Sequence, residues 1–221
     1  MSAASAVRTF EVRHVQLARA LFAAVAAVMI TFSPDHSAAV GMSVFSGYAT
    51  ATAVIFLVSA WLVHPAGRRA VPITLGAITL VAAILGGIPV LRTPVGFFAV
   101  VIGWAAVSGA VELVSGIRGR RTQPAARDEI LIGAVTLALV AGLLLVNPAY
   151  SLEYFIAEAG GAFTLTGITI GVGLFGGYAA IVAVFLGIAG FSPRRDEHAS
   201  TVAASPAASA PSTPSNPEVA S

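Results

Sequence analysis

Six apolar runs constrain the fold of this chain more than any other feature of its sequence. Crossing about 30 Å of hydrocarbon takes roughly 17 to 25 helical residues. The runs that meet or approach this length are Val15 to Phe32, Val40 to Val63, Val71 to Leu91, Val95 to Ile117, Ile130 to Val146 and Thr164 to Gly190. Only 10% of the residues are charged, far below the roughly 25% of soluble domains. We therefore predict an all-α integral membrane protein with six transmembrane helices.

The even-numbered runs share an internal repeat. They align without gaps as "GYATATAVIFLVSA" from Gly47, "GWAAVSGAVELVSG" from Gly103 and "GYAAIVAVFLGIAG" from Gly177. The odd-numbered runs each end near a proline, where helical hydrogen bonding stops: Pro34, Pro94 and Pro148. We predict helical hairpins at about 15–69, 71–121 and 130–195, after a short cytoplasmic segment, 1–14, and before a tail, 196–221.

The first run allows a second interpretation. Arg8, Arg13 and Arg19 precede or enter it, and "HSAAV" follows it, as in a cleaved signal peptide. Cleavage would remove half of the first hairpin, so the repeat favours a retained helix. In that helix we expect Arg19 to extend toward the lipid headgroups.

The third hairpin carries an insertion, "AYSLEYFIAEAGGAFTLTG", after Pro148. An interfacial helix, a longer loop and a partly re-entrant segment all remain open for it. Its carboxylates, Glu153 and Glu158, favour the surface.

The distribution of arginine predicts the orientation. All twelve basic residues are arginines, and basic residues stay on the cytoplasmic side of a membrane. With the N-terminus inside, eleven of the twelve lie on the inner face and only Arg92 lies outside. We predict a cell (inner or plasma) membrane protein with both termini cytoplasmic. The Ala-, Ser- and Pro-rich tail, 196–221, is predicted to be disordered.

The sequence lacks the motifs of common enzyme sites. It has no Gly-rich phosphate loop followed by Lys, no histidine pair at ligand spacing, no cysteine and no serine nucleophile with a nearby base. We predict no catalytic activity, no cofactor, no metal site and no nucleic-acid partner. The lipid bilayer is the expected partner.

Small residues predict close helix packing. Gly167 with Gly171, and Gly173 with Gly177, each form a G-x-x-x-G pair that lets another helix approach. Packing within the monomer and a contact in a homo-oligomer are both open for these glycines.

Aromatic residues open the three repeated segments. Tyr48, Trp104 and Tyr178 follow the first glycine of each, toward the predicted outer side. We expect them to anchor the helices at the membrane interface.

Glu112 is the only acidic residue inside the six runs. Its counterparts in the repeat are Phe56 and Leu186, so the repeat does not require it. Ser108 and Ser115, at i−4 and i+3, share its helical face and are candidate hydrogen-bond partners. Because burial disfavours the charged form, we expect Glu112 to be largely protonated at neutral pH and to tolerate Gln. It is a packing group, a proton- or ion-linked functional group, or a group that water reaches from the inner face.

Four titratable residues lie in the predicted outer loops: Asp35, His36, Glu153 and Glu158. Acidification would charge the histidine and then neutralise the carboxylates, so this surface would change from acidic to basic. It is either a pH-responsive surface or simply the side from which arginine is excluded.

Several of these motifs resemble one family. The Gly-aromatic-Ala opening, the Gly109-x-x-Glu112 step, the helix ending "SGIRGRR" and the following "GLLLVNPAYS" are similar to the HdeD-like acid-resistance membrane proteins. The resemblance is strongest over Val71 to Ser151. It implies a six-helix inner-membrane protein, built from short repeated hairpins and tied to acid-stress resistance. The insertion after Pro148 and the tail depart from the family pattern.

Two classes of function follow. The first is a non-enzymatic membrane protein that contributes to acid or envelope stress resistance, as the resemblance implies. The second is a small proton- or solute-linked transporter or channel that uses Glu112. Transport paths usually need several polar residues facing one cavity, and the six runs contain few, so the sequence favours the first.

Overall fold

The computed structural model describes residues 10–123, 125–156 and 161–192. Its long helices are α1 (Val12–Phe32), α2 (Ala38–Leu62), α3 (Ala70–Gly87), α4 (Pro94–Gly119), α5 (Ala126–Leu145) and α6 (Gly167–Phe191). Two 3₁₀ turns, η1 (Ala66–Arg68) and η2 (Pro89–Leu91), and two strands, β1 (Ser151–Ile156) and β2 (Gly161–Thr166), complete it. The predicted all-α class with six long helices is confirmed. The predicted tail, 196–221, and residues 1–9 lie outside the described residues.

All six helices are long and apolar enough to cross a membrane. Mean hydropathy over their best windows runs from 1.6 to 2.2. Large apolar side chains point outward, among them Leu145 at 89% and Phe191 at 80% exposure, an arrangement that suits lipid and not water. The chain is a multi-pass membrane protein.

Local sequence sets the ends of two helices. Ser37 caps α2, since its Oγ accepts a hydrogen bond from the Val40 amide. Thr93 caps α4 in the same way, with its Oγ1 accepting from the Gly96 amide at 3.1 Å. Pro94 takes the first helical position of α4, where the missing N–H has no intrahelical partner to lose.

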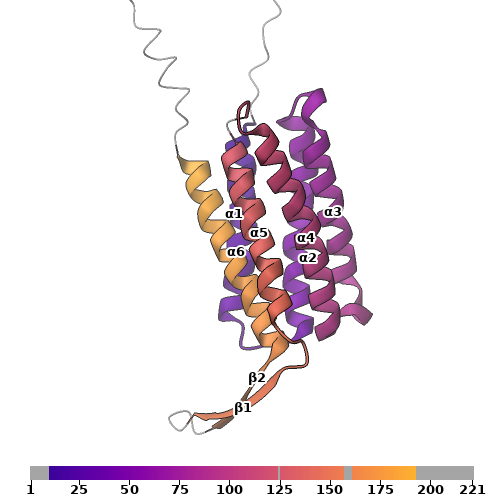
Figure 1. The fold of residues 1–221 in the computed structure, drawn as a ribbon, viewed down its shortest axis with the longest axis vertical. Coiled ribbons are helices and arrows are strands. Elements are labelled where there is room, and N and C mark those ends of the chain that lie inside the picture. The colour runs from indigo at the N-terminus through magenta and orange to yellow at the C-terminus, as the bar shows by residue number, and fades with distance from the viewer. Residues whose placement is uncertain (1–9, 124, 157–160, 193–221) are drawn as a thin grey trace, which may run out of the picture. The chain divides into compact units, whose positions relative to one another are not determined.

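The helices form a closed ring in chain order, with α1 packed against α6. Figure 1 shows them from the side as one bundle, with β1 and β2 extending from one end. The most extensive contacts join α1 to α6, α2 to α3, and α4 to α5. Glycines permit these close approaches: Gly76 faces Leu57, Gly133 faces the Leu113 backbone, and Gly190 faces Leu17. The predicted hairpins are neighbours in the ring, but the closest packing lies between them and not within them.

The insertion after Pro148 is an antiparallel β-hairpin, so none of the three forms considered for it is correct. Strands β1 and β2 pair in register, with Tyr154 opposite Phe163 and their rings stacked at 6.0 Å. Leu152 and Tyr154 share one face of β1, since side chains alternate along a strand, while Phe155 places an aromatic ring on the other face. Strand β2 also takes Thr164–Thr166 from the predicted start of the sixth span, and α6 begins at Gly167.

The repeated aromatic residues lie in the centre of the ring. Tyr48, Trp104 and Tyr178 are only 4–6% exposed, and the Trp104 ring lies 6.0 Å from each tyrosine ring. Phe45 and Phe175, fully buried, join the same layer. The prediction of interfacial anchors was wrong, because these side chains point to the axis and not to lipid.

Two threonines fix this layer. Thr79 on α3 accepts a hydrogen bond from Trp104 Nε1 at 3.2 Å. Thr136 on α5 lies 3.1 Å from the Tyr178 hydroxyl. Each bond joins a helix to the next one in the chain, and each satisfies a buried polar group that would otherwise cost free energy.

Candidate functional site

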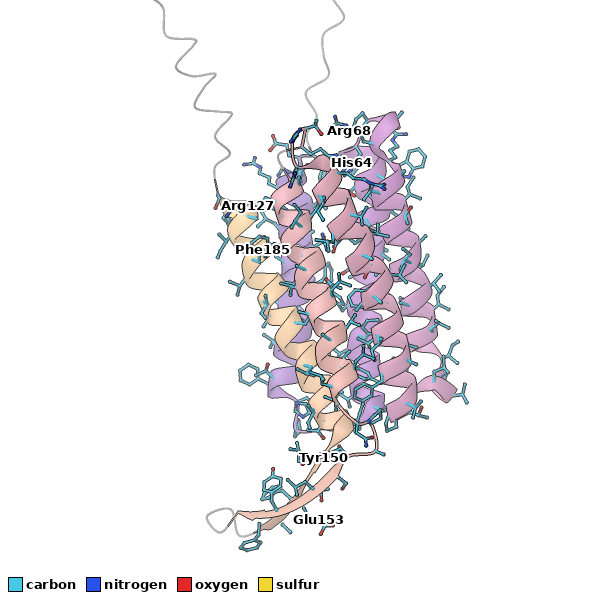
Figure 2. All side chains as sticks on the ribbon, viewed as in Figure 1. His64, Arg68, Arg127, Tyr150, Glu153 and Phe185 are labelled. Carbon is cyan, nitrogen blue, oxygen red and sulfur yellow. The ribbon has the colours of Figure 1, made fainter. Side chains whose placement is uncertain are left out.

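The two ends of the helical ring differ in charge. Arg68 and Arg127 mark one end, where α2 and α4 finish and α3 and α5 begin, while Tyr150 and Glu153 mark the other (Figure 2). We call the end with Arg68 and Arg127 the arginine-rich end. It also holds Arg118, in the last turn of α4. The β-hairpin extends from the opposite end.

A cavity of about 80 Å³ runs from the arginine-rich end into the ring. Such a volume holds several water molecules, since one needs roughly 10–15 Å³. Each of the six helices contributes one side chain to the inner limit of the cavity: Arg19, Phe56, Leu75, Glu112, Ile132 and Leu186. Polar and titratable residues line it nearer the arginine-rich end: Gln16, Ser59, His64, Asp128 and Glu129.

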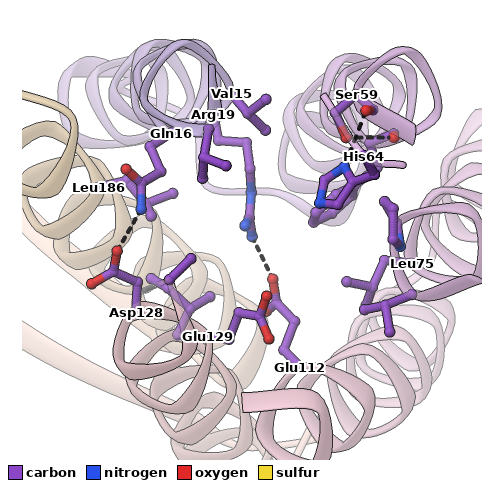
Figure 3. Close-up of a pocket in the computed structure, with 16 residues that line it drawn as sticks. Val15, Gln16, Arg19, Ser59, His64, Leu75, Glu112, Asp128, Glu129 and Leu186 are labelled. Carbon is purple, nitrogen blue, oxygen red and sulfur yellow. Dashed lines mark hydrogen bonds and ion pairs between the residues drawn. The ribbon is translucent and has the colours of Figure 1, made fainter. Parts of the chain in front are cut away.

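Arg19 and Glu112 form an ion pair at this inner limit. Arg19 Nη2 donates to Glu112 Oε1 at 2.8 Å, and the two side chains are only 13% and 5% exposed. The guanidinium also lies 4.4 Å from the centre of the Phe56 ring, within range of a cation–π contact. Figure 3 shows Arg19 reaching across the cavity from α1 to α4.

The ion pair occupies two positions that are apolar elsewhere in the repeat. Glu112 corresponds to Phe56 and Leu186 in the aligned segments. The packing shows which residue corresponds to Arg19. Leu17 on α1 contacts Gly190 on α6 as Ile130 on α5 contacts Gly116 on α4, and the two glycines are equivalent in the repeat. Arg19 and Ile132 each follow two residues later, so Ile132 is the counterpart of Arg19. The fold therefore accepts apolar side chains at this level, and the ion pair is specific to one pair of helices.

Two further polar contacts tie α5 to other helices beside the ion pair. Gln16 Nε2 donates to Asp128 Oδ2 at 2.5 Å, joining α1 to α5. Ser115 Oγ donates to Glu129 Oε2 at 2.9 Å, joining α4 to α5. Both carboxylates lie in the first turn of α5, where the helix dipole favours negative charge.

The predicted partners of Glu112 are therefore wrong. Ser108 Oγ donates to the Trp104 carbonyl at 2.7 Å, and Ser115 is bound to Glu129. The partner of Glu112 is Arg19, which comes from another helix. Arg19 points into the ring, so the expectation that it extends toward the headgroups is wrong.

The aromatic layer lies beyond the ion pair on the way to the opposite end. Trp104 precedes Glu112 by two helical turns, or about 12 Å along α4, and Ser108 between them is 4% exposed. The described side chains thus fill the ring axis between the cavity and the end that carries the β-hairpin.

The predicted outer residues that the structure describes lie away from this site. Asp35 accepts hydrogen bonds from the Ser37 amide and hydroxyl at 2.7 and 3.0 Å, so it holds the turn before α2. Glu153 is exposed on β1, His36 lies in the turn beside Asp35, and Glu158 lies outside the described residues. Asp35, His36 and Glu153 do not line the cavity.

One of the two glycine pairs packs inside the protein, and the other faces open space. A Cβ added at Gly171 would contact the Phe98 ring, and one at Gly167 would meet the Asn147 backbone. Gly173 and Gly177 have open space around them and line a groove between α5 and α6. Packing within the monomer accounts for the first pair only.

Sequence reasoning missed five polar members of the site: Gln16, Ser59, His64, Asp128 and Glu129. The residues at 128 and 129 were visible as acidic residues before the fifth run, inside an arginine-rich loop. Their contribution depends on α4 lying beside α5 and on the Gln16 side chain of α1 reaching α5, which no local pattern shows.

No family model matches the chain, and no curated protein or solved structure matches it either.

Proposed function

We propose that this chain is a non-enzymatic protein of the cell (inner or plasma) membrane that contributes to acid or envelope stress resistance. The observation that carries the proposal is the buried Arg19–Glu112 ion pair at the inner limit of a cavity lined by Asp128 and Glu129. Such a group of titratable residues gives the protein a means of responding to protons. The resemblance of its motifs to the HdeD-like proteins points to acid as the stress to which the protein responds.

We further propose that the arginine-rich end is cytoplasmic, with both termini on that side. The distribution of arginine supports this orientation, because basic residues stay on the cytoplasmic side. Among the described arginines, Arg92 alone lies at the opposite end, which carries the β-hairpin. The cavity would then open to the cytoplasm, and its groups would respond to cytoplasmic pH. Lipid surrounds the ring, and the groove at Gly173 and Gly177 is the surface for contact with a second copy.

A second candidate function is a small proton- or solute-linked transporter that uses Glu112. The cavity favours it, because several polar groups face one space inside the membrane. The aromatic layer around Trp104 would have to move in a transport cycle, since it fills the axis in this conformation. Proton flux through the purified protein in liposomes separates this function from a non-transporting stress role.

Single cysteines should report the orientation, because the chain has no native cysteine. We expect Glu153→Cys to react with a membrane-impermeant maleimide in intact cells. Arg68→Cys, exposed at the other end, should react only in inverted membrane vesicles. Labelling of Arg68→Cys in intact cells, with Glu153→Cys protected, would reverse the proposed orientation.

Acid survival tests the stress role. Cells that produce the full chain should survive exposure to low pH at least several-fold better than cells with an empty vector. The matched control is survival at neutral pH, which should be equal. Equal survival at low pH, with the protein present in the membrane, would reject the stress role.

A further inference from the structure

The cavity has more negative than positive charge. Glu112, Asp128 and Glu129 line it together with Arg19, which leaves a net charge of −2 when His64 is neutral. Arg19 is bound to Glu112. Within the described ranges, no arginine or histidine forms an ion pair with Asp128 or Glu129, whose contacts are to Gln16 and Ser115. The helix dipole of α5 offsets part of this charge, and a bound cation would offset the rest.

An unsatisfied hydrogen-bond acceptor lies beside these carboxylates. Gln16 is only 5% exposed, and its Nε2 is bound to Asp128. Its Oε1 is buried and has no hydrogen-bond partner among the described residues. A buried carbonyl oxygen without a donor costs free energy, so the occupant of this space should bring a donor. Carboxylate oxygens and this amide oxygen all demand the same chemistry.

The geometry disfavours a bare metal ion as the occupant. The described part of the chain contains no group of three or more acidic or histidine side chains placed to hold one metal ion. The carboxylates line one cavity but do not converge on one point. A ligand with several N–H donors on different sides can reach separate acceptors, whereas a metal ion needs its oxygen ligands around a single centre.

Arg19 shows how such a ligand is held. Its guanidinium binds a carboxylate, Glu112, at 2.8 Å and lies over an aromatic ring, Phe56. This combination of an acidic group and a ring face is the chemistry that recognises organic cations. The cavity thus already holds one guanidinium, tethered to α1, next to the uncompensated carboxylates.

We propose that the cavity binds a small organic cation with N–H donors, an alkylammonium or alkylguanidinium, between Asp128, Glu129 and Gln16 Oε1. The volume of about 80 Å³ admits only a few non-hydrogen atoms. The proposal rests on the cavity alone, so it stands whether or not the protein has a role in acid stress.

Thermal unfolding of the purified full chain in detergent tests the proposal. A ligand that binds the folded state raises the Tm with its concentration, and the buried Trp104 reports unfolding by its fluorescence. We expect ethylammonium and methylguanidinium chlorides to raise the Tm in a saturable way at millimolar concentrations. Tetramethylammonium chloride at the same ionic strength has the charge but no N–H donor, so it should raise the Tm much less.

Variants locate the binding. Losing a charged hydrogen bond weakens binding by about tenfold or more, so Asp128→Asn should raise the half-saturating concentration by that factor. Glu129→Gln provides the same test if Asp128→Asn does not fold. Glu153→Gln, on the exposed β-hairpin, is the control and should behave as the parent.

Three results would overturn the proposal. The first is a Tm that neither probe raises, which would mean that water alone fills the cavity. The second is an equal response to tetramethylammonium or sodium, which would mean a general salt effect. The third is unchanged binding in both cavity variants, which would place the cation elsewhere.

Discussion

Arg19→Leu should lower the free energy of unfolding by about 3–5 kcal/mol, and Glu112→Gln should be destabilising in the same direction. Each change leaves one buried charge without its partner, since the two side chains are 13% and 5% exposed. Glu112→Leu should be destabilising for the same reason, because it leaves the Arg19 guanidinium buried among apolar side chains. The tolerance of Gln that the sequence suggested is not expected once Arg19 is taken into account.

The double variant Arg19→Leu with Glu112→Leu should recover most of this loss. Ile132 occupies the position that corresponds to Arg19, and Phe56 and Leu186 those that correspond to Glu112. Leucine therefore suits both sites. Replacing a buried ion pair by apolar residues is often neutral or stabilising, and we expect the double variant within about 1.5 kcal/mol of the parent. Chemical unfolding in detergent, followed by fluorescence, measures the four proteins of this cycle.

A second ion pair in the described residues serves as the control. Arg13 Nε lies 3.1 Å from Glu11 Oε2, but both side chains are 55% exposed. Arg13→Leu should cost at most about 1 kcal/mol. Additive losses at positions 19 and 112, with no recovery in the double variant, would show that the two residues do not act as a pair.

Gly133→Ala should destabilise the protein by about 1–3 kcal/mol through overpacking. A Cβ at this position would lie 2.5 Å from the Leu113 amide nitrogen and 2.8 Å from the Gly109 carbonyl oxygen. These are backbone atoms of α4, so α4 and α5 would have to separate. The cost is therefore paid at one of the three closest helix contacts in the ring.

Gly103→Ala is the matched control, because a Cβ there meets nothing within 4 Å. Alanine favours a helix over glycine by up to about 1 kcal/mol, so this variant should equal or exceed the parent in stability. The same unfolding assay measures both. A Gly133→Ala variant as stable as Gly103→Ala would contradict the close α4–α5 packing.

Much of the fold could be predicted because its signal is local. A run of apolar residues long enough to cross a bilayer identifies a helix on its own, and Pro94 with Thr93 marks a helix start within a few residues. The β-hairpin was missed although Leu152 and Tyr154 in β1, and Phe163 and Leu165 in β2, each have the two-residue spacing of a strand. Its position inside an apolar chain favoured helical interpretations over the period of a strand.

The site was harder to predict because its residues come together through helix order. Glu112 stood out by departing from the repeat, but its partner lies 93 positions away on α1. The positive-inside rule explained Arg19 as one of many arginines at the inner face. Nothing in the sequence therefore indicated that its side chain points into the ring. Likewise, the repeat showed that Tyr48, Trp104 and Tyr178 are equivalent without showing that they meet at the axis.

Acid survival of the double variant tests the central claim most directly, namely that the Arg19–Glu112 pair is functional and not only structural. The variant is expected to fold, so a loss of function would not be a loss of protein. We predict that cells producing Arg19→Leu with Glu112→Leu, at the same membrane abundance as the parent, survive low pH no better than cells with an empty vector. Survival equal to that of cells with the parent protein would contradict the claim and leave the ion pair a packing element.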